Sequence, residues 1–318
     1  MTTSPTTSAP AQFTGVVPPV ATPFLPDGSL DVASLERLVD RLVTDGVNGL
    51  FALGSTGETA YLTEQQRVEV VKTIVRANAG RVPIIAGAIE LTAARVVESA
   101  RRLTAEGVDA IVVTAPLYAL NSRAETAEHF RTIARGIDVP LWAYDVPVRV
   151  HSKLPVDLVI ELAQEGVIAG IKDSSGDDVG FRRLIAANAE AGRPLQVFTG
   201  HEVVVDAIAL AGADGVVPGL ANVDAAGYVR LWDAASRGDW DAARTEQERL
   251  NRLFEIVFQS TGRSPDAAGV GAFKTAMQAR GIIDHATMAH PVEVLDEQTV
   301  DRIRGILDSL ELVGTPTP

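Results

Sequence analysis

The chain has 318 residues, of which 46% are hydrophobic and 22% charged, and its formal net charge is −13. It contains no cysteine, which excludes disulfides, thiolate nucleophiles and cysteine-ligated zinc or iron–sulfur clusters. The acidic charge and the lack of a long basic run argue against nucleic acid and anionic membranes as partners. A small anionic substrate stays open, because a few local cations decide its binding.

Both ends of the chain are expected to be tails. Residues 1–12 are rich in Ser, Thr and Pro and lack the basic and apolar regions of a signal peptide, and residues 313–318 are rich in Thr and Pro. No apolar run reaches ~18 residues, so no membrane span is expected. The cytoplasm is the expected location.

Eight short apolar runs have the composition of buried parallel strands. They lie at 15–24, 49–55, 83–88, 109–116, 140–146, 168–173, 195–200 and 215–220. Amphipathic stretches separate them, and in the first stretch one helical face collects Leu35, Leu38, Val39, Leu42 and Val43. Several of these helices are expected to end just before a glycine, namely Gly46, Gly80, Gly107 and Gly166.

Eight strands alternating with helices at a spacing of ~20–35 residues predict a (β/α)8 TIM barrel. A doubly wound open sheet is the rival, but it usually has fewer strands, and the chain has no glycine-rich dinucleotide loop. After the eighth run only helices are expected, at 225–236, 240–260, 269–280 and 298–310. The predicted organisation is a barrel core over 13–223 with C-terminal helices packed on it over 224–312.

Lys172 is the most informative single residue, because it stands near the end of the apolar run 168–173. Protein interiors rarely hold an unpaired ammonium, and a neutral amine is a nucleophile toward carbonyl groups. Of the other lysines, Lys72 and Lys274 lie in helix-like segments and Lys153 lies in a polar loop. Lys172 is therefore the candidate for a Schiff base. A strand-end lysine that simply reaches water is the alternative.

Chemistry in such barrels lies at the C-terminal ends of the strands. The second run ends in GSTGE at 54–58, whose hydroxyl and N–H groups suit a carboxylate, although an ordinary turn has the same composition. Tyr144 ends the fifth run and can exchange protons with Lys172; an aromatic packing residue is the alternative. Arg149 follows and can clamp a carboxylate; a solvated loop residue is the alternative.

Metal chemistry finds little support in the sequence. The five histidines are not spaced as ligand pairs, and neither an H-E-x-x-H motif nor a calcium-binding loop is present. His201 and Glu202 follow the seventh run and are expected at the surface. A Schiff-base mechanism without a metal is therefore favoured over a metal-dependent aldolase.

Three segments together resemble the signature regions of the dihydrodipicolinate synthase / N-acetylneuraminate lyase family. They are GSTGE at 54–58, YDVP at 144–147 and GIKDSSGD at 170–177. Their order and spacing agree with the family, and the similarity extends over 13–312, with residues 215–222 matching as well. The resemblance implies a class I lyase that acts on pyruvate or another 2-keto acid and needs no cofactor beyond the lysine imine.

The resemblance also implies roles for individual residues. Lys172 would form the imine, and Tyr144 would relay protons through the hydroxyl of Ser55. Tyr118 would complete the relay from a neighbouring subunit, in a homotetramer built as a dimer of dimers. The remaining substrate contacts would come from Thr56, Arg149, Gly200 and Val217, with Thr56 on the pyruvate carboxylate and Arg149 on the carboxylate of aspartate semialdehyde.

Some positions depart from the synthases. Ser55 stands where they usually have threonine, Leu117 replaces an aromatic residue, and Gly219 lacks the serine of the sialate lyases. Glu90 and Ala94 do not match the residues that bind lysine as an inhibitor, so no lysine inhibition is expected. The expected reaction is that of 4-hydroxy-tetrahydrodipicolinate synthase. The alternatives are a 2-keto-3-deoxy sugar-acid aldolase, a keto-deoxy acid dehydratase using the same imine, and a non-catalytic 2-keto-acid binder.

Overall fold

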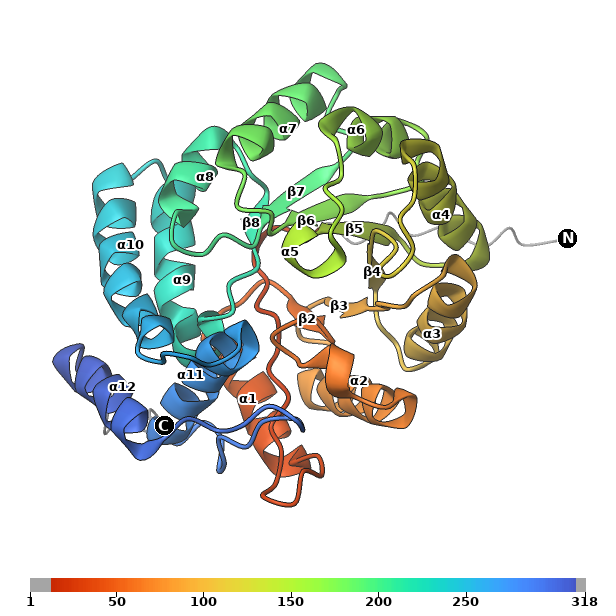
Figure 1. Ribbon diagram of the computed structural model, residues 1–318. Coiled ribbons are helices and arrows are strands. Elements are labelled where there is room, and N and C mark those ends of the chain that lie inside the picture. The colour runs from red at the N-terminus through yellow and green to blue at the C-terminus, as the bar shows by residue number, and fades with distance from the viewer. Residues whose placement is uncertain (1–12, 313–318) are drawn as a thin grey trace, which may run out of the picture.

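A barrel of eight parallel strands, surrounded by helices, forms the centre of the computed structural model, which describes residues 13–312 (Figure 1). The hydrogen-bonded order is β1-β8-β7-β6-β5-β4-β3-β2. A parallel bridge between Pro19 and Phe51 joins the two ends of this order and closes the barrel. The strands are β1 (Gly15–Val16), β2 (Leu50–Ala52), β3 (Ile84–Gly87), β4 (Ala110–Thr114), β5 (Leu141–Asp145), β6 (Gly170–Asp173), β7 (Gln196–Thr199) and β8 (Gly215–Val216).

Helices follow the strands in the alternation that the sequence predicts. Around the barrel they are α1 (Val32–Thr44), α2 (Glu64–Asn78), α3 (Ala93–Ala105), α4 (Arg123–Gly136), α6 (Val156–Gln164), α7 (Asp178–Glu190), α8 (Val205–Ala211) and α9 (Ala221–Ser236). The short helix α5 (Pro147–Val150) lies inside this ring (Figure 1). The four glycines expected after helices all have a positive φ, between 71° and 100°. The predicted (β/α)8 barrel is therefore confirmed.

The first and last strands are much shorter than their apolar runs. Each keeps only two paired residues, although the runs extend to 24 and 220. Proline has no N–H to donate to a ladder, and Pro18, Pro19 and Pro218 lie two or three residues after the ends of these strands. The chain is still buried along both runs. The apolar composition therefore predicted burial correctly but overestimated the length of these two strands.

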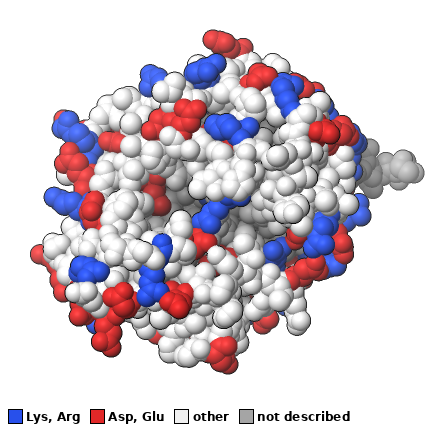
Figure 2. Space-filling model, viewed as in Figure 1, with Lys and Arg blue, Asp and Glu red and all other residues white. Residues whose placement is uncertain are grey.

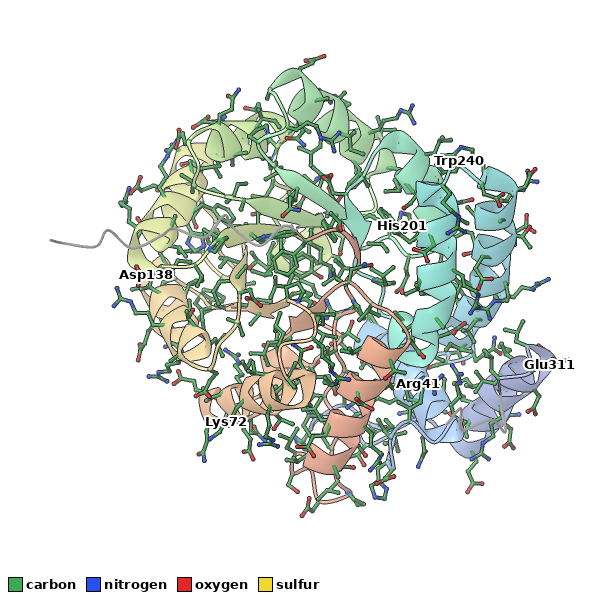
Figure 3. The ribbon with its side chains drawn as sticks, turned by 180° about the vertical axis from the view of Figure 1, so that it is seen from behind. Arg41, Lys72, Asp138, His201, Trp240 and Glu311 are labelled. Atoms are coloured by element: carbon green, nitrogen blue, oxygen red, sulfur yellow. The ribbon has the colours of Figure 1, made fainter. Side chains whose placement is uncertain are left out.

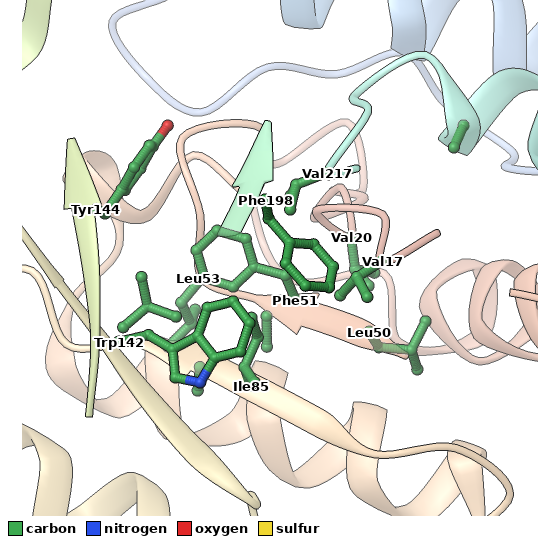
Figure 4. Packing of buried hydrophobic residues seen from close by; sticks show 14 of the residues in the cluster. Val17, Val20, Leu50, Phe51, Leu53, Ile85, Trp142, Tyr144, Phe198 and Val217 are labelled. Carbon is green, nitrogen blue, oxygen red and sulfur yellow. The ribbon is translucent and has the colours of Figure 1, made fainter. Parts of the chain in front are cut away.

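The lower part of the barrel is filled by aromatic rings. Trp142 packs edge-on against Phe13 and Phe198, with ring centroids 5.4 and 5.2 Å apart. Figure 4 shows Phe51 beside this group and Tyr144 above it, with the Tyr144 hydroxyl directed away from the rings. A Cβ added to Gly170 would come within 2.4 Å of the Trp142 ring, so glycine at this position makes room for the indole. These rings fill one end of the barrel interior, so a site inside the barrel is expected at the other end, where the strands have their C-termini.

The C-terminal helices lie outside the ring, beside α9 (Figure 1). They are α10 (Trp240–Phe254), the short 3-10 helix η2 (Glu255–Phe258), α11 (Pro265–Ala279) and α12 (Glu297–Ser309). α11 begins four residues before its predicted start, with the Ser264 side chain capping it and Pro265 in its first turn. The predicted division at 223/224 falls inside α9 and stays a prediction. Both predicted tails lie outside the described residues.

Charged side chains lie mainly on the outer helices. Figure 3, seen from behind, shows Lys72, Asp138 and Glu311 at the periphery of the molecule. On the opposite face, Figure 2 shows acidic and basic groups interspersed around a central hollow. Among the helices of residues 13–312, none is long and apolar enough to cross a membrane.

Candidate active site

Lys172 and Tyr144 form the centre of the candidate site. They are paired in register on β6 and β5, near the C-terminal ends of these strands. Both side chains are buried, and Lys172 is 5% exposed. The alternative that Lys172 reaches open water is therefore wrong, and the packing alternative for Tyr144 does not account for its contact with an amine.

The Lys172 ammonium lies between two aromatic faces. Its Nζ is 4.3 Å from the ring centroid of Tyr144 and 5.1 Å from that of Phe51, distances typical of cation–π contacts. A Cβ added to Gly200 would come within 3.1 Å of Lys172 Cε and 2.0 Å of Ser174 Oγ. Gly200 thus leaves room beside the lysine stem, and a larger residue there would have to displace the Ser174 side chain.

The environment of Tyr144 makes its phenol more acidic than usual. Burial by itself would raise its pKa, but the charge of Lys172 and the polar contacts with Ser55, Ser174 and Lys172 outweigh burial, so the pKa is lowered. Tyr144 and Ser55 both line the smaller of the two cavities described below. A phenol with a lowered pKa, beside an amine, can both accept and return a proton.

The GSTGE segment after β2 forms a tight turn at the mouth. The N–H groups of Gly57 and Glu58 donate to the carbonyls of Gly54 and Ser55, each at 3.0 Å. Glu58 has a left-handed φ of 55°, which non-glycine residues seldom adopt. The turn holds Ser55 and Thr56 half-buried, with both residues facing the mouth of the barrel.

A buried pair anchors this turn from behind. Lys274, on α11, is fully buried and pairs with the Glu58 carboxylate. Lys274 also donates to the Thr287 carbonyl at 2.9 Å, and Glu58 accepts the Ala289 N–H at 2.8 Å. Lys274 was not expected to have a role, because its segment is helix-like in the sequence. Its apolar neighbours, GVGAF before it and TAM after it, carry the same signal of burial as those of Lys172.

Glu202 lies beside the hydroxyl turn. A Cβ added to Gly219 would come within 3.3 Å of Thr56 Oγ1 and 3.4 Å of Glu202 Oε1, so both groups flank this glycine. Burial raises the pKa of Glu202 to about 7, although the Leu220 N–H and the charge of Lys172 oppose that rise. Glu202 is half-buried and lines the larger cavity, so its predicted surface position holds only in part. His201 does lie at the rim, where its Nδ1 is 2.9 Å from Asp178.

Arg149 lies on α5 at the mouth and already has a carboxylate partner. Both of its terminal nitrogens contact Asp266, at the start of α11, with Nη1–Oδ2 at 3.1 Å. The Tyr61 hydroxyl donates to the same Oδ2 at 2.8 Å. Arg149 is therefore not a free solvated loop residue. Asp266 and Tyr61 were not singled out in the sequence, because nothing in their local patterns distinguishes them.

Two neighbouring cavities, of about 290 and 480 Å³, open at this end of the barrel. They share Ser55, Arg149 and Asp266, and Tyr144 lines the smaller one and Thr56 the larger. Figure 2 shows the corresponding hollow near the middle of this face. Among residues 13–312, no three His, Cys, Asp or Glu side chains are grouped as a metal site.

Tyr118 and Val217 have no contact with Lys172 among those described above. Tyr118 is 89% exposed on the loop after β4, so within one chain it does not reach Lys172. Val217 is buried next to β8 and packs in the apolar core near Phe198 (Figure 4). Like Lys172 and Gly200, it does not line either of the two cavities. Lys172, Tyr144, Ser55, Thr56, Gly200 and Arg149 do come together around the mouth.

Comparison with known proteins shows that this chain belongs to a known family. The model of the "Dihydrodipicolinate synthetase family" matches residues 12–310. A 4-hydroxy-tetrahydrodipicolinate synthase of Methanoculleus marisnigri is 32% identical, over 93% of this chain and 98% of the relative. An uncharacterized DapA-like lyase of Halobacterium salinarum is 31% identical over 98% of both chains. The crystal structure of Escherichia coli YagE with pyruvate superimposes with a TM-score of 0.89 at 29% identity, covering 95% of this chain and 100% of YagE.

Proposed function

This chain is a lyase of the dihydrodipicolinate synthetase family, and we propose that it forms or cleaves a carbon–carbon bond through an imine between Lys172 and pyruvate. One observation carries the proposal: the buried amine of Lys172 lies over the ring of Tyr144, whose pKa is lowered and which lines the smaller cavity. The crystal structure of YagE, which contains pyruvate, supports pyruvate as the donor substrate.

The proposed reaction begins when the neutral amine of Lys172 attacks C2 of pyruvate and water leaves, which gives a protonated imine. The imine withdraws electrons, so a base can remove a proton from C3 and leave an enamine. C3 then attacks the carbonyl carbon of an aldehyde, whose oxygen takes up a proton. Water finally hydrolyses the imine and frees Lys172. Cleavage is the same sequence in reverse.

The residues around Lys172 suit these proton transfers. Tyr144 is the proposed base at C3, and it returns the proton to the new hydroxyl with Ser55 as relay. The Ser55–Thr56 turn is the proposed site of the pyruvate carboxylate, because its hydroxyl and N–H groups face the cavity. Tyr118 is proposed to act in a neighbouring copy of a homotetramer, since it projects from the surface of its own chain.

The first candidate reaction is that of 4-hydroxy-tetrahydrodipicolinate synthase, the name given to relatives 30–32% identical to this chain. In that reaction Arg149 is the proposed partner of the carboxylate of aspartate semialdehyde. A second candidate is an aldolase or dehydratase acting on a keto-deoxy acid through the same imine. The contact between Arg149 and Asp266 favours this second candidate, because Arg149 is already paired with a carboxylate of its own chain and is not free to bind that of aspartate semialdehyde.

Borohydride trapping tests the shared first step. The protein is incubated with pyruvate, reduced, and examined by intact mass and peptide mapping. The expected result is one adduct on Lys172, kept in Lys72→Arg and lost in Lys172→Arg, with both variants folded. Absence of an adduct with pyruvate and with other 2-keto acids would favour a non-catalytic binder instead.

Aldol assays then separate the candidate reactions. Pyruvate with aspartate semialdehyde tests the synthase. For keto-deoxy acids, an aldolase releases pyruvate and an aldehyde, whereas a dehydratase leaves the carbon skeleton unchanged. The products therefore distinguish the two, and they do so without any further structural assumption.

A further inference from the structure

Asp266 removes the free positive charge from the mouth of the barrel. It holds both terminal nitrogens of Arg149 and accepts the Tyr61 hydroxyl, so Arg149 is held by a carboxylate of its own chain. The Asp266 side chain is 13% exposed and that of Arg149 41%. The Asp266 carboxylate is thus the more deeply buried partner. A ligand that approaches Arg149 finds the guanidinium already paired with Asp266.

Several features keep Asp266 ionised and in place. Burial would raise its pKa, but the hydrogen bonds from Arg149 and Tyr61 outweigh burial and lower it. Asp266 also lies in the first turn of α11, where the helix dipole favours a negative charge. A substrate carboxylate that bound Arg149 would have to displace Asp266 and would leave two carboxylates close together in a partly desolvated space.

The rest of the mouth offers no replacement cation. Within the described residues, Arg149 is the only Lys or Arg that lines either cavity, whereas the lining carboxyl groups are Glu58, Glu202 and Asp266. The larger cavity is walled by apolar side chains, among them Phe254, Val257, Phe258 and Phe273. Phe258 is 64% exposed, and its ring lies 5.8 Å from that of Phe254. The second substrate therefore contacts the Arg149–Asp266 pair, which carries no net charge, and the phenylalanine side chains that line the larger cavity.

We propose that Asp266 is a specificity-determining residue, which excludes second substrates carrying a carboxylate and selects an uncharged aldehyde with an apolar substituent. This inference rests on the proposed function, because it concerns the partner of the imine on Lys172. Asp266 acts through Arg149: while the pair is intact, the guanidinium is satisfied. When the pair is broken, the guanidinium becomes a carboxylate receptor.

Borohydride trapping of longer 2-keto acids tests this inference without the need for an aldehyde. 2-Oxoadipate and 2-oxoheptanoate form the same imine on Lys172 and differ at the far end, which is a carboxylate in one and an ethyl group in the other. The half-saturating concentration of each for adduct formation is measured by intact mass. In the native protein, 2-oxoheptanoate is expected to bind at least tenfold more tightly.

Asp266→Asn keeps the size of the side chain and removes its charge. It is expected to shift the preference toward 2-oxoadipate by tenfold or more. The double variant Asp266→Asn/Arg149→Met should lose that gain, which a merely structural role of Asp266 would not predict. Asp301→Asn, an exposed aspartate on α12, is the matched control and should leave the preference unchanged, and thermal unfolding checks that each variant is folded.

The outcomes separate this inference from the proposed function. A native preference for 2-oxoadipate, or an unchanged preference in Asp266→Asn, would overturn the inference while the pyruvate adduct remained. Loss of the shift toward 2-oxoadipate only when Arg149 is also replaced would support it. Failure to trap pyruvate itself would overturn both proposals.

Discussion

Tyr144 and Lys172 are neighbours in register across the β5–β6 pair, and the Lys172 Nζ lies over the face of the Tyr144 ring at 4.3 Å. The positive charge of the amine is therefore stabilised by the ring of the same residue whose hydroxyl is proposed to transfer protons. Because the two side chains project from adjacent strands, the backbone fixes their separation. The pair is thus available before any substrate arrives.

Replacing Tyr144 by phenylalanine should impair proton transfer and keep the aromatic face. We expect the exchange of pyruvate methyl protons for deuterium, followed by NMR in D2O, to slow by about 10²–10⁴-fold, the range for loss of a general acid–base group. This exchange needs no second substrate. The pyruvate adduct should still form on Lys172, at a reduced rate.

Tyr228→Phe is the matched control for that experiment. Tyr228 is also fully buried, but its hydroxyl donates to the Glu202 carbonyl at 3.2 Å and lies on α9 outside the proposed relay. Its exchange rate should stay within a few-fold of the native value. If Tyr144→Phe and Tyr228→Phe behaved alike, Tyr144 would have no special role in the proton transfer.

Breaking the Glu58–Lys274 pair should destabilise the fold. Glu58→Gln leaves a fully buried ammonium without its carboxylate, a change that typically costs about 3–5 kcal/mol. The free energy of unfolding in urea measures this, and Glu58→Gln/Lys274→Met should recover part of the loss. Asp157→Asn, which removes a partner of the exposed Arg123, should change stability by less than about 1 kcal/mol. Equal losses in Glu58→Gln and Asp157→Asn would contradict the burial argument.

The titration of Glu202 should appear in the pH dependence of pyruvate binding. Its pKa is raised to about 7, so the carboxyl is largely protonated at pH 6 and ionised at pH 8. Because it flanks Thr56, the ionised form should repel the pyruvate carboxylate and raise the KM for pyruvate several-fold over this interval. Glu202→Gln should lack this component, so identical pH profiles for the two proteins would rule the effect out.

The same group should also contribute to the pH dependence of stability. Its pKa in the folded protein lies above the ordinary value of 4.5, so the folded state binds the proton more tightly than the unfolded state does. The stabilisation from this group is therefore complete below pH 4.5 and is lost as the pH rises through about 7. Glu202→Gln should flatten that part of a urea-unfolding profile.

Tyr118 should act in a neighbouring subunit if the proposed assembly forms. Lys172→Arg and Tyr118→Phe are each expected to be impaired alone. When they are mixed and allowed to exchange subunits, some sites would combine an intact Lys172 from one chain with an intact Tyr118 from the other. Recovery of activity on mixing, with analytical ultracentrifugation showing a tetramer, is the expected result. A monomer, or a mixture no more active than its parts, would exclude this role.

The architecture was predictable because its signals are local. Each strand is a short apolar run, and each helix carries an apolar face, so the alternation that defines the barrel can be read without knowing which elements touch. Lys172, Tyr144 and Ser55 could be singled out in the sequence for a related reason. They stand at the C-terminal ends of strands, and these ends all meet at one end of such a barrel. Position within the repeat was enough to bring them together.

Contacts between distant segments were not predictable in this way. Asp266 meets Arg149 across 117 positions of the chain, and Lys274 meets Glu58 from a helix outside the barrel ring. Neither partner shows in its local sequence which residue it will meet. The contact of Glu202 with the Leu220 N–H, 18 positions further along the chain, was likewise not evident from its position after a strand.

The anchoring of Glu58 by Lys274 makes α11 a support of the turn that we propose binds the pyruvate carboxylate. The turn that carries Ser55 and Thr56 is held from behind by a helix that is far away in the sequence. Binding of pyruvate at the turn and packing of α11 against it are therefore expected to be thermodynamically linked, so that each stabilises the other. Saturating pyruvate should accordingly slow amide hydrogen exchange in Pro265–Ala279, a segment far from the imine along the chain.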